Sequence, residues 1–87
     1  MSTVRKLNES ALRGIYDAYM HEAFPPAELK PLAVMLRLME RGRYLCYGYY
    51  RNGRLAAYAF FYRHDSRVLL LDYFAVTPEL RGRGVGS

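Results

Sequence analysis

The sequence predicts an α+β fold, and three observations indicate this class. Apolar residues recur at helical spacing only in the first half of the chain. The second half contains three apolar or aromatic runs of strand length, two of them joined by Asn52-Gly53. The last run leads directly into a segment rich in glycine and arginine. We therefore expect one strand, two helices and then a three-stranded antiparallel meander that ends in a glycine-rich loop.

Length and composition limit the fold to one domain. The 87 residues, 52% of them hydrophobic, allow a modest core. The N-terminus is polar and no apolar run approaches the length of a membrane span, so we expect neither a signal peptide nor a membrane segment. A single cysteine, Cys46, fits a reducing compartment, and we predict a cytoplasmic protein without a metal site.

The first half of the chain should form a strand and a helix. Thr3 to Leu7 is a short strand, and Asn8 is a suitable N-cap for a helix over Glu9 to Ala23. Helical spacing predicts one buried stripe on this helix, made of Leu12, Ile15, Tyr16, Tyr19 and Ala23.

A second helix should follow the break at Phe24-Pro25-Pro26. We expect it over Ala27 to Arg41, with Pro31 either in its first turn or at its true start, and with Gly42 as the terminating residue. Its inner face should carry Leu32, Met35, Leu36 and Met39.

The meander follows from turn residues. Tyr44 to Arg51 and Leu55 to Arg63 flank Asn52-Gly53, whose residues suit the positive φ angles of a type I′ turn. A turn at His64-Asp65-Ser66 then returns the chain as a third strand over Val68 to Val76.

The segment after the third strand has the composition of an anion-binding turn. Glycines at 82, 84 and 86 leave backbone N–H groups free to close on a phosphate. Arg81 and Arg83 add positive charge, and a helix that begins near Gly84 would direct its N-terminus at the same anion.

The run Leu71-Asp72-Tyr73-Phe74-Ala75-Val76-Thr77-Pro78-Glu79-Leu80-Arg81-Gly82-Arg83-Gly84-Val85-Gly86-Ser87 resembles the central strand and pyrophosphate loop of the GCN5-related N-acetyltransferases, the GNAT superfamily. The family's Gln/Arg-x-x-Gly-x-Gly/Ala pattern is met by Arg81, Gly84 and Gly86. The resemblance covers the family's first half, so we interpret residues 1–87 as a partial domain that stops after the pyrophosphate loop.

The resemblance implies transfer of an acetyl group from acetyl-coenzyme A (acetyl-CoA) to a primary amine of a small molecule or protein, by direct attack in a ternary complex. It implies that the backbone of Phe74, Ala75 and Val76 binds the pantetheine arm at a bulged strand, with an N–H near Phe74 facing the thioester oxygen. The pyrophosphate would be held by Arg81, Gly82, Arg83, Gly84, Val85, Gly86 and Ser87.

The resemblance also implies a catalytic role for Asp72, which occupies the place of an acidic residue in many family members. The alternative is that Asp72 binds a cationic acceptor or pairs with an arginine. Tyr73 should alternate to the opposite face and join the core. In the family, the link between the helices lines the acceptor site, which here involves Glu22, Phe24 and Glu28. His21 and His64 are expected at the surface.

Two other functions stay open. A net charge of +5 and a terminus with Arg81 and Arg83 also suit a nucleic-acid-binding module. The scattered arginines make this less favoured. The third hypothesis is a non-catalytic fragment that self-associates through an uncovered edge of the strand Val68 to Val76.

Overall fold

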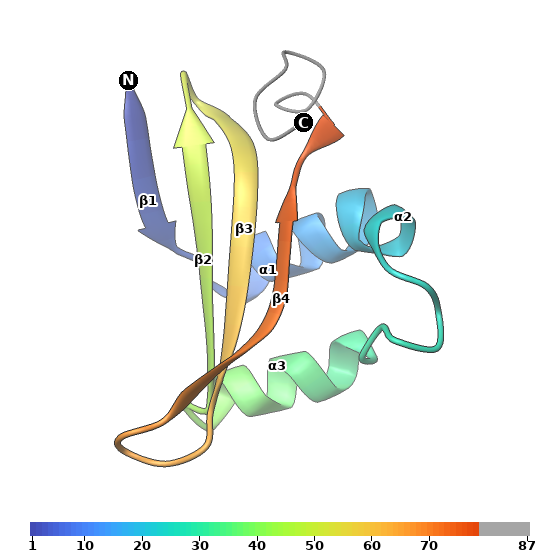
Figure 1. Cartoon of the computed structure of the whole chain (residues 1–87), viewed down its shortest axis with the longest axis vertical. Helices are drawn as coiled ribbons and strands as arrows, with labels where there is room; N and C mark the ends of the chain where they lie inside the picture. The colour runs from blue at the N-terminus through green and yellow to red at the C-terminus, as the bar shows by residue number, and fades with distance from the viewer. Residues whose placement is uncertain (79–87) are drawn as a thin grey trace.

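The computed structural model describes residues 1–78. Its elements are β1 (Ser2–Lys6), α1 (Glu9–Ile15), η1 (Tyr16–Met20), α2 (His21–Ala23), α3 (Leu32–Glu40), β2 (Tyr44–Arg51), β3 (Arg54–Arg63) and β4 (Leu69–Val76). The four strands form one antiparallel sheet in the order β1-β2-β3-β4. In Figure 1 the helices lie on one side of this sheet, and β1 and β4 are at its two edges. The predicted α+β class and the antiparallel meander are confirmed.

The first helical segment is continuous over the predicted range but changes its pitch. The side chain of Asn8 accepts a hydrogen bond from the Ala11 N–H at 2.9 Å, as expected of an N-cap. After α1, the π-helical turn η1 places more residues in each turn and rotates the buried face. Met20 is therefore fully buried while Ala23 is exposed, so the predicted stripe is wrong at its last position.

The second helix is shorter than predicted. Pro31 is its N-cap, with an extended ψ of 140°, so the helix begins at the proline and not at Ala27. Its end is a Schellman motif: Arg43 N–H donates to the Leu38 carbonyl and Gly42 N–H to the Met39 carbonyl. Gly42 has a φ of +72°, which explains why glycine stands there.

The hairpin between β2 and β3 forms at the predicted position. Asn52 and Gly53 have φ angles of 52° and 80°, the left-handed values of a type I′ turn. The ladder is irregular where Tyr49 pairs with Ala57 but Tyr50 pairs with Leu55. This irregularity is next to Gly48, which is buried and closely surrounded by side chains.

The core lies between the sheet and the helices. Buried residues from every layer meet there: Leu7, Leu12, Ile15, Tyr16, Met20, Met35, Tyr44, Cys46, Tyr58, Phe60 and Tyr73. The opposite face of the sheet carries no helix among residues 1–78, and it exposes apolar side chains on β4. The described chain is thus a two-layer structure with one packed face.

Candidate functional site

A β-bulge in β4 places the first candidate residue. Phe60 pairs with Tyr73 whereas Phe61 pairs with Leu71, so Asp72 is an extra residue without a partner on β3. The bulge interrupts the alternation of side chains, and both Asp72 and Tyr73 contact the segment between the helices. The expectation that Tyr73 alternates to the opposite face from Asp72 is therefore wrong, whereas its place in the core is confirmed.

Asp72 is the centre of a half-buried polar cluster. Its Oδ2 accepts a hydrogen bond from the Tyr44 hydroxyl at 2.5 Å and forms an ion pair with the Lys30 Nζ at 3.0 Å. The side chains of Lys30 and Asp72 are 32% and 23% exposed, so solvent reaches both charges. The cluster therefore combines a fixed carboxylate with access from outside the protein.

The backbone of Lys30 is fixed from two sides by tyrosines. Its N–H donates to the Tyr73 hydroxyl at 2.7 Å, and that hydroxyl donates to the Glu28 carbonyl at 2.8 Å. The Lys30 carbonyl accepts a hydrogen bond from Tyr16 at 2.9 Å. Phe24 packs edge-on against Tyr73, with 4.8 Å between ring centroids. These contacts attach the link between the helices to β4 beside Asp72.

Burial and the charge of Asp72 change the acidity of two neighbouring groups. Burial raises the pKa of the Tyr44 phenol far above its ordinary value, and the hydrogen bond to Asp72 raises it further. Burial also raises the pKa of the Cys46 thiol to about 12, with a smaller contribution from the Asp72 charge. Both groups are therefore protonated at neutral pH, and Tyr44 acts as a hydrogen-bond donor.

The outer edge of β4 carries backbone groups that do not point toward β3. Thr77 N–H donates to the Ala56 carbonyl at 2.8 Å, which fixes the phase of the ladder at this end. In an antiparallel ladder the hydrogen-bonding side alternates from one residue to the next. The N–H and C=O of Ala75, one of the three residues expected to bind the pantetheine arm, therefore point toward its partner Tyr58 on β3 and not toward the edge. The N–H and C=O groups of Phe74 and Val76 then face the outer edge of β4, which has no neighbouring strand within residues 1–78.

Thr77, the residue directly after β4, is buried and hydrogen-bonded to β3, so it fixes the end of this strand. It is 1% exposed, and its hydroxyl lies 3.0 Å from the Leu55 carbonyl and 3.2 Å from the Ala56 carbonyl. The predicted pyrophosphate residues Arg81, Gly82, Arg83, Gly84, Val85, Gly86 and Ser87 lie outside the described residues.

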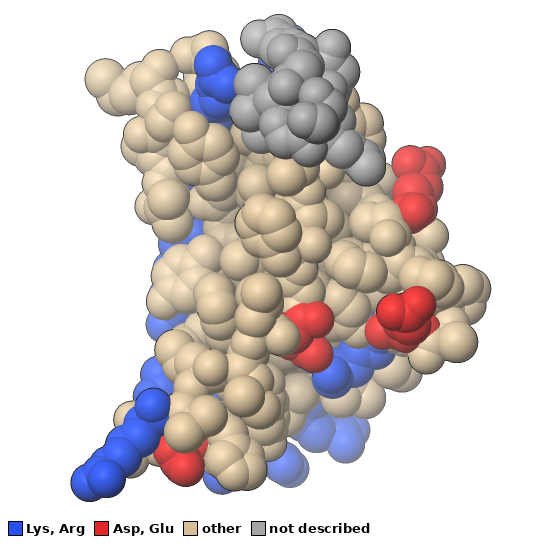
Figure 2. All heavy atoms as spheres, viewed as in Figure 1, with Lys and Arg blue, Asp and Glu red and all other residues tan. Residues whose placement is uncertain are grey.

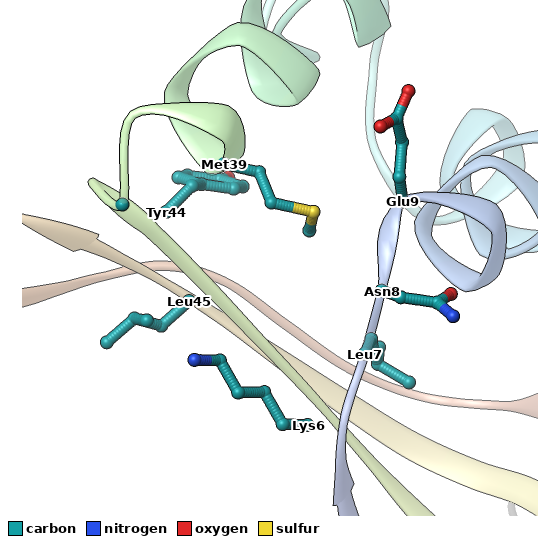
Figure 3. A pocket seen from close by; sticks show the side chains of 8 residues that line it. Lys6, Leu7, Asn8, Glu9, Met39, Tyr44 and Leu45 are labelled. Carbon is teal, nitrogen blue, oxygen red and sulfur yellow. The ribbon is translucent and has the colours of Figure 1, made fainter.

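An open pocket lies at the opposite end of β2 from the hairpin (Figure 3). It is formed where the connection from β1 to α1 passes the end of α3, and its lining consists of Lys6, Leu7, Asn8, Glu9, Met39, Gly42, Tyr44 and Leu45. In Figure 3 the amine of Lys6 and the carboxylate of Glu9 point away from each other. The pocket therefore gathers no reactive set of side chains, although Tyr44 also belongs to the Asp72 cluster.

The remaining candidates do not form a second site. His21 and His64 are exposed, as predicted, and His21 lies edge-on to the Tyr16 ring. Within residues 1–78, no group of three or more His, Cys, Asp or Glu side chains is arranged to hold a metal ion. In the same range, no helix has both the length and the apolar character needed to cross a membrane.

Sequence reasoning missed Lys30 and Tyr44. Lys30 is a single lysine before a proline, and Tyr44 is a tyrosine at the start of a strand, so neither belongs to a recognisable motif. Both are far from Asp72 in the sequence and contact it only in the folded structure. Phe24 and Glu28, which lie in the same link as Lys30, were in contrast named in advance, because the family resemblance implies that the link between the helices lines the acceptor site.

Comparison with known proteins connects this geometry to one family. The sequence model described as "Acetyltransferase (GNAT) family" matches residues 10–87. Among solved structures, the chain is similar to the ribosomal-protein-S18-alanine N-acetyltransferase from Escherichia coli, with a TM-score of 0.67 and 24% sequence identity. The similarity covers 97% of this chain but 51% of that enzyme, so the chain spans about half of its length. A search of curated proteins finds no match. With the family match over most of its length, the chain belongs to the GNAT acetyltransferase family.

Proposed function

We propose that this chain is the cofactor-binding part of an N-acetyltransferase that transfers an acetyl group from acetyl-CoA to a primary amine. The observation that carries the proposal is the outer edge of β4, which pairs with no other strand among residues 1–78 and where Phe74 and Val76 direct backbone N–H and C=O groups away from the sheet. Family membership and the similarity to an N-acetyltransferase fold support the same reaction class.

The edge of β4 fits an extended amide-containing ligand. A strand edge with alternating donors and acceptors binds such a ligand as an additional strand, and the pantetheine arm of coenzyme A contains two amides. In the proposal, Phe74 and Val76 supply these contacts, with Ala75 between them holding β4 on β3. The residues Arg81 to Ser87 would bind the pyrophosphate through backbone N–H groups and arginine charge.

Asp72 is the proposed base. Acetyl-CoA, when bound, would supply an acetyl thioester whose carbon–sulfur bond breaks as the amine nitrogen forms the amide; the sulfur leaves with the electron pair and takes up the second proton that the nitrogen loses. Asp72 binds the ammonium form of the acceptor and takes its proton, which frees the lone pair for attack. Tyr44 fixes Oδ2 of Asp72 by its hydrogen bond, so the carboxylate keeps one position. In the proposal, the backbone N–H of Phe74 would stabilise the negative charge that develops on the thioester oxygen.

Calorimetric titration with acetyl-CoA tests the proposal. We expect binding to the chain and loss of binding in Gly84→Glu, because a carboxylate and its side-chain bulk in the loop oppose a diphosphate. Gly14→Glu is the matched control. Gly14 is an exposed helical residue with nothing within 4 Å of an added Cβ, so the same change there should leave acetyl-CoA binding intact.

The same titration separates the alternative functions. Equal affinity in the chain and in Gly84→Glu, or binding in neither, would count against the proposal. Salt-sensitive binding to RNA or DNA without binding to coenzyme A would favour the nucleic-acid-binding module instead.

A further inference from the structure

We infer that Asp72 and Tyr73 form a binding position for a primary alkylammonium group, and that the side chain of Lys30 is its built-in occupant. The inference rests on the proposed function, since it names the form of the acceptor amine and the residue that competes with it. The acceptor would be a protonated, unhindered primary amine that displaces Lys30 from Asp72.

The geometry around the Lys30 Nζ is that of an ammonium site. The Nζ lies 3.0 Å from Oδ2 of Asp72 and 5.9 Å from the centroid of the Tyr73 ring. A carboxylate and an aromatic face are the two groups that recognise an alkylammonium in proteins, through a charge-assisted hydrogen bond and a cation–π contact. A primary ammonium is therefore already bound beside the proposed base.

The occupant can leave without disturbing the fold. The fixed part of Lys30 is its backbone, held by Tyr16 and Tyr73, whereas its side chain is a flexible stem that is one-third exposed. Release of the Nζ would leave Asp72 paired with the Tyr44 hydroxyl and open to a second cation. The position can therefore exchange one ammonium for another.

The charge on this face is mixed. Figure 2 shows acidic side chains beside β4 and around α2 and the segment that follows it, with Lys and Arg side chains directly below them and along the left-hand edge. The attraction for a cationic amine therefore comes from the Asp72 carboxylate itself and not from the net charge of the chain, which is +5.

A titration with n-butylammonium chloride, followed by NMR of the amides of Asp72 and Tyr73, tests the inference without any acyl donor. Lys30→Met keeps the length of the stem and removes the charge. A partly exposed ion pair such as Lys30–Asp72 is weak, so it lowers the affinity of Asp72 for a competing cation only several-fold. We therefore expect Lys30→Met to bind n-butylammonium about fivefold more tightly than the unchanged chain. Adding Asp72→Asn to Lys30→Met should abolish the gain.

Three comparisons make the result specific. Lys30→Arg keeps an occupant and should bind like the unchanged chain, and so should Lys6→Met, which removes an equal charge away from Asp72. Replacing n-butylammonium with n-butyltrimethylammonium, which keeps the charge but has no N–H to donate to Asp72, should make the gain in Lys30→Met smaller. Lys30→Gln is a second variant with the same expectation as Lys30→Met, since both keep the backbone hydrogen bonds of Lys30.

Equal affinities in Lys30→Met and the unchanged chain, or an equal gain in Lys6→Met, would overturn the inference. If either result is found while acetyl-CoA binds normally, only the role of Lys30 is rejected and the proposed function stands. Loss of acetyl-CoA binding together with the expected amine pattern would instead remove the acetyl-transfer proposal and leave the ammonium site.

Discussion

At the scale of single residues, the most consequential contact is the hydrogen bond from the Tyr44 hydroxyl to Asp72. The hydroxyl is buried at the start of β2, whereas Asp72 is the bulged residue of β4. A buried hydroxyl donor is costly without an acceptor, and the Asp72 carboxylate supplies one. In return, the neutral hydroxyl stabilises the partly desolvated carboxylate without bringing a second charge into the site. This one contact therefore both stabilises the fold and positions the proposed base.

Tyr44→Phe tests this contact. It removes the hydroxyl and keeps the ring, so we expect the free energy of unfolding to fall by about 1.5–3 kcal/mol, as for a hydrogen bond to a charged group. Urea denaturation measures the change. Tyr62→Phe makes the same substitution at the cross-strand neighbour of Tyr44 and should change stability by less than about 0.5 kcal/mol. Equal losses in the two variants would contradict the assigned role of Tyr44.

The thiol of Cys46 should make stability depend on pH in the alkaline range. Its pKa rises from 9.0 in an ordinary environment to about 12 in the fold, first because of burial and then because of Asp72. The folded state therefore holds a proton that the unfolded state releases. This contribution to stability is complete below about pH 9 and is lost as the pH rises toward about 12. In urea denaturation across this range, Cys46→Ala should lose stability less steeply than the unchanged chain.

At the scale of elements, two glycines have opposite roles. A Cβ on Gly48 in β2 would lie 2.9 Å from Cε1 of Tyr50 and 3.0 Å from Cδ1 of Leu55. The strand therefore needs a residue without a side chain at this point. Gly14 in α1 has open space around it and contributes only conformational freedom.

Substitution at these glycines should change stability in opposite directions. We expect Gly48→Val to lower the free energy of unfolding by about 1–3 kcal/mol through overpacking. Gly14→Ala should raise it by about 0.5–1 kcal/mol through helix propensity. Thermal unfolding of both variants checks the pair, and a stable Gly48→Val protein would show that Tyr50 and Leu55 move aside easily.

The edge of β4 gives a prediction about the cofactor. Phe74→Pro removes an N–H that faces away from β3, so the sheet should survive while acetyl-CoA binding weakens about tenfold, the effect of one lost hydrogen bond. Phe74→Ala keeps the N–H and should bind more tightly than Phe74→Pro. Calorimetry measures both, with circular dichroism to confirm folding. Equal affinities in the two variants would argue against a backbone contact at Phe74.

At the scale of the whole molecule, the described chain has one covered and one uncovered face. Leu71 and Phe74 pair with Phe61 and Ala59 on the face of the sheet that is opposite the helices, and they are 60% and 57% exposed. Apolar side chains next to a strand edge favour contact with another chain. The self-association considered from the sequence stays a prediction on this basis.

Sedimentation velocity tests self-association. We expect the chain to associate with rising concentration, and Leu71→Lys to reduce the association because a charge on this face opposes burial. Val34→Lys is the control, since Val34 is an exposed apolar residue on α3, on the other side of the molecule. Equal association in both variants would exclude the β4 face as the contact.

Most of the architecture could be predicted from the sequence, because the residues that begin and end helices and turn the hairpin act only on their immediate neighbours in the chain. Asn8 begins the first helix, Gly42 ends the second, and Asn52-Gly53 turns the hairpin, all as expected. For the second helix the sequence left two starts open, Ala27 and Pro31, and the structure has the second, because the proline excludes the preceding residues from the helix. The π-helical turn had no local signal, because it depends on how Tyr16 and Met20 pack into the core.

The sequence by itself therefore determined the order of the elements, the family resemblance and Asp72 as the candidate base. Only the tertiary structure decided that Asp72 occupies a bulge and that it meets Lys30, which is 42 positions away in the chain. The physical reason is the distance along the chain over which the interacting residues are separated. Caps, turns and periodicity depend on neighbouring residues, whereas a bulge and an ion pair between distant segments depend on how the sheet and the link between the helices pack together.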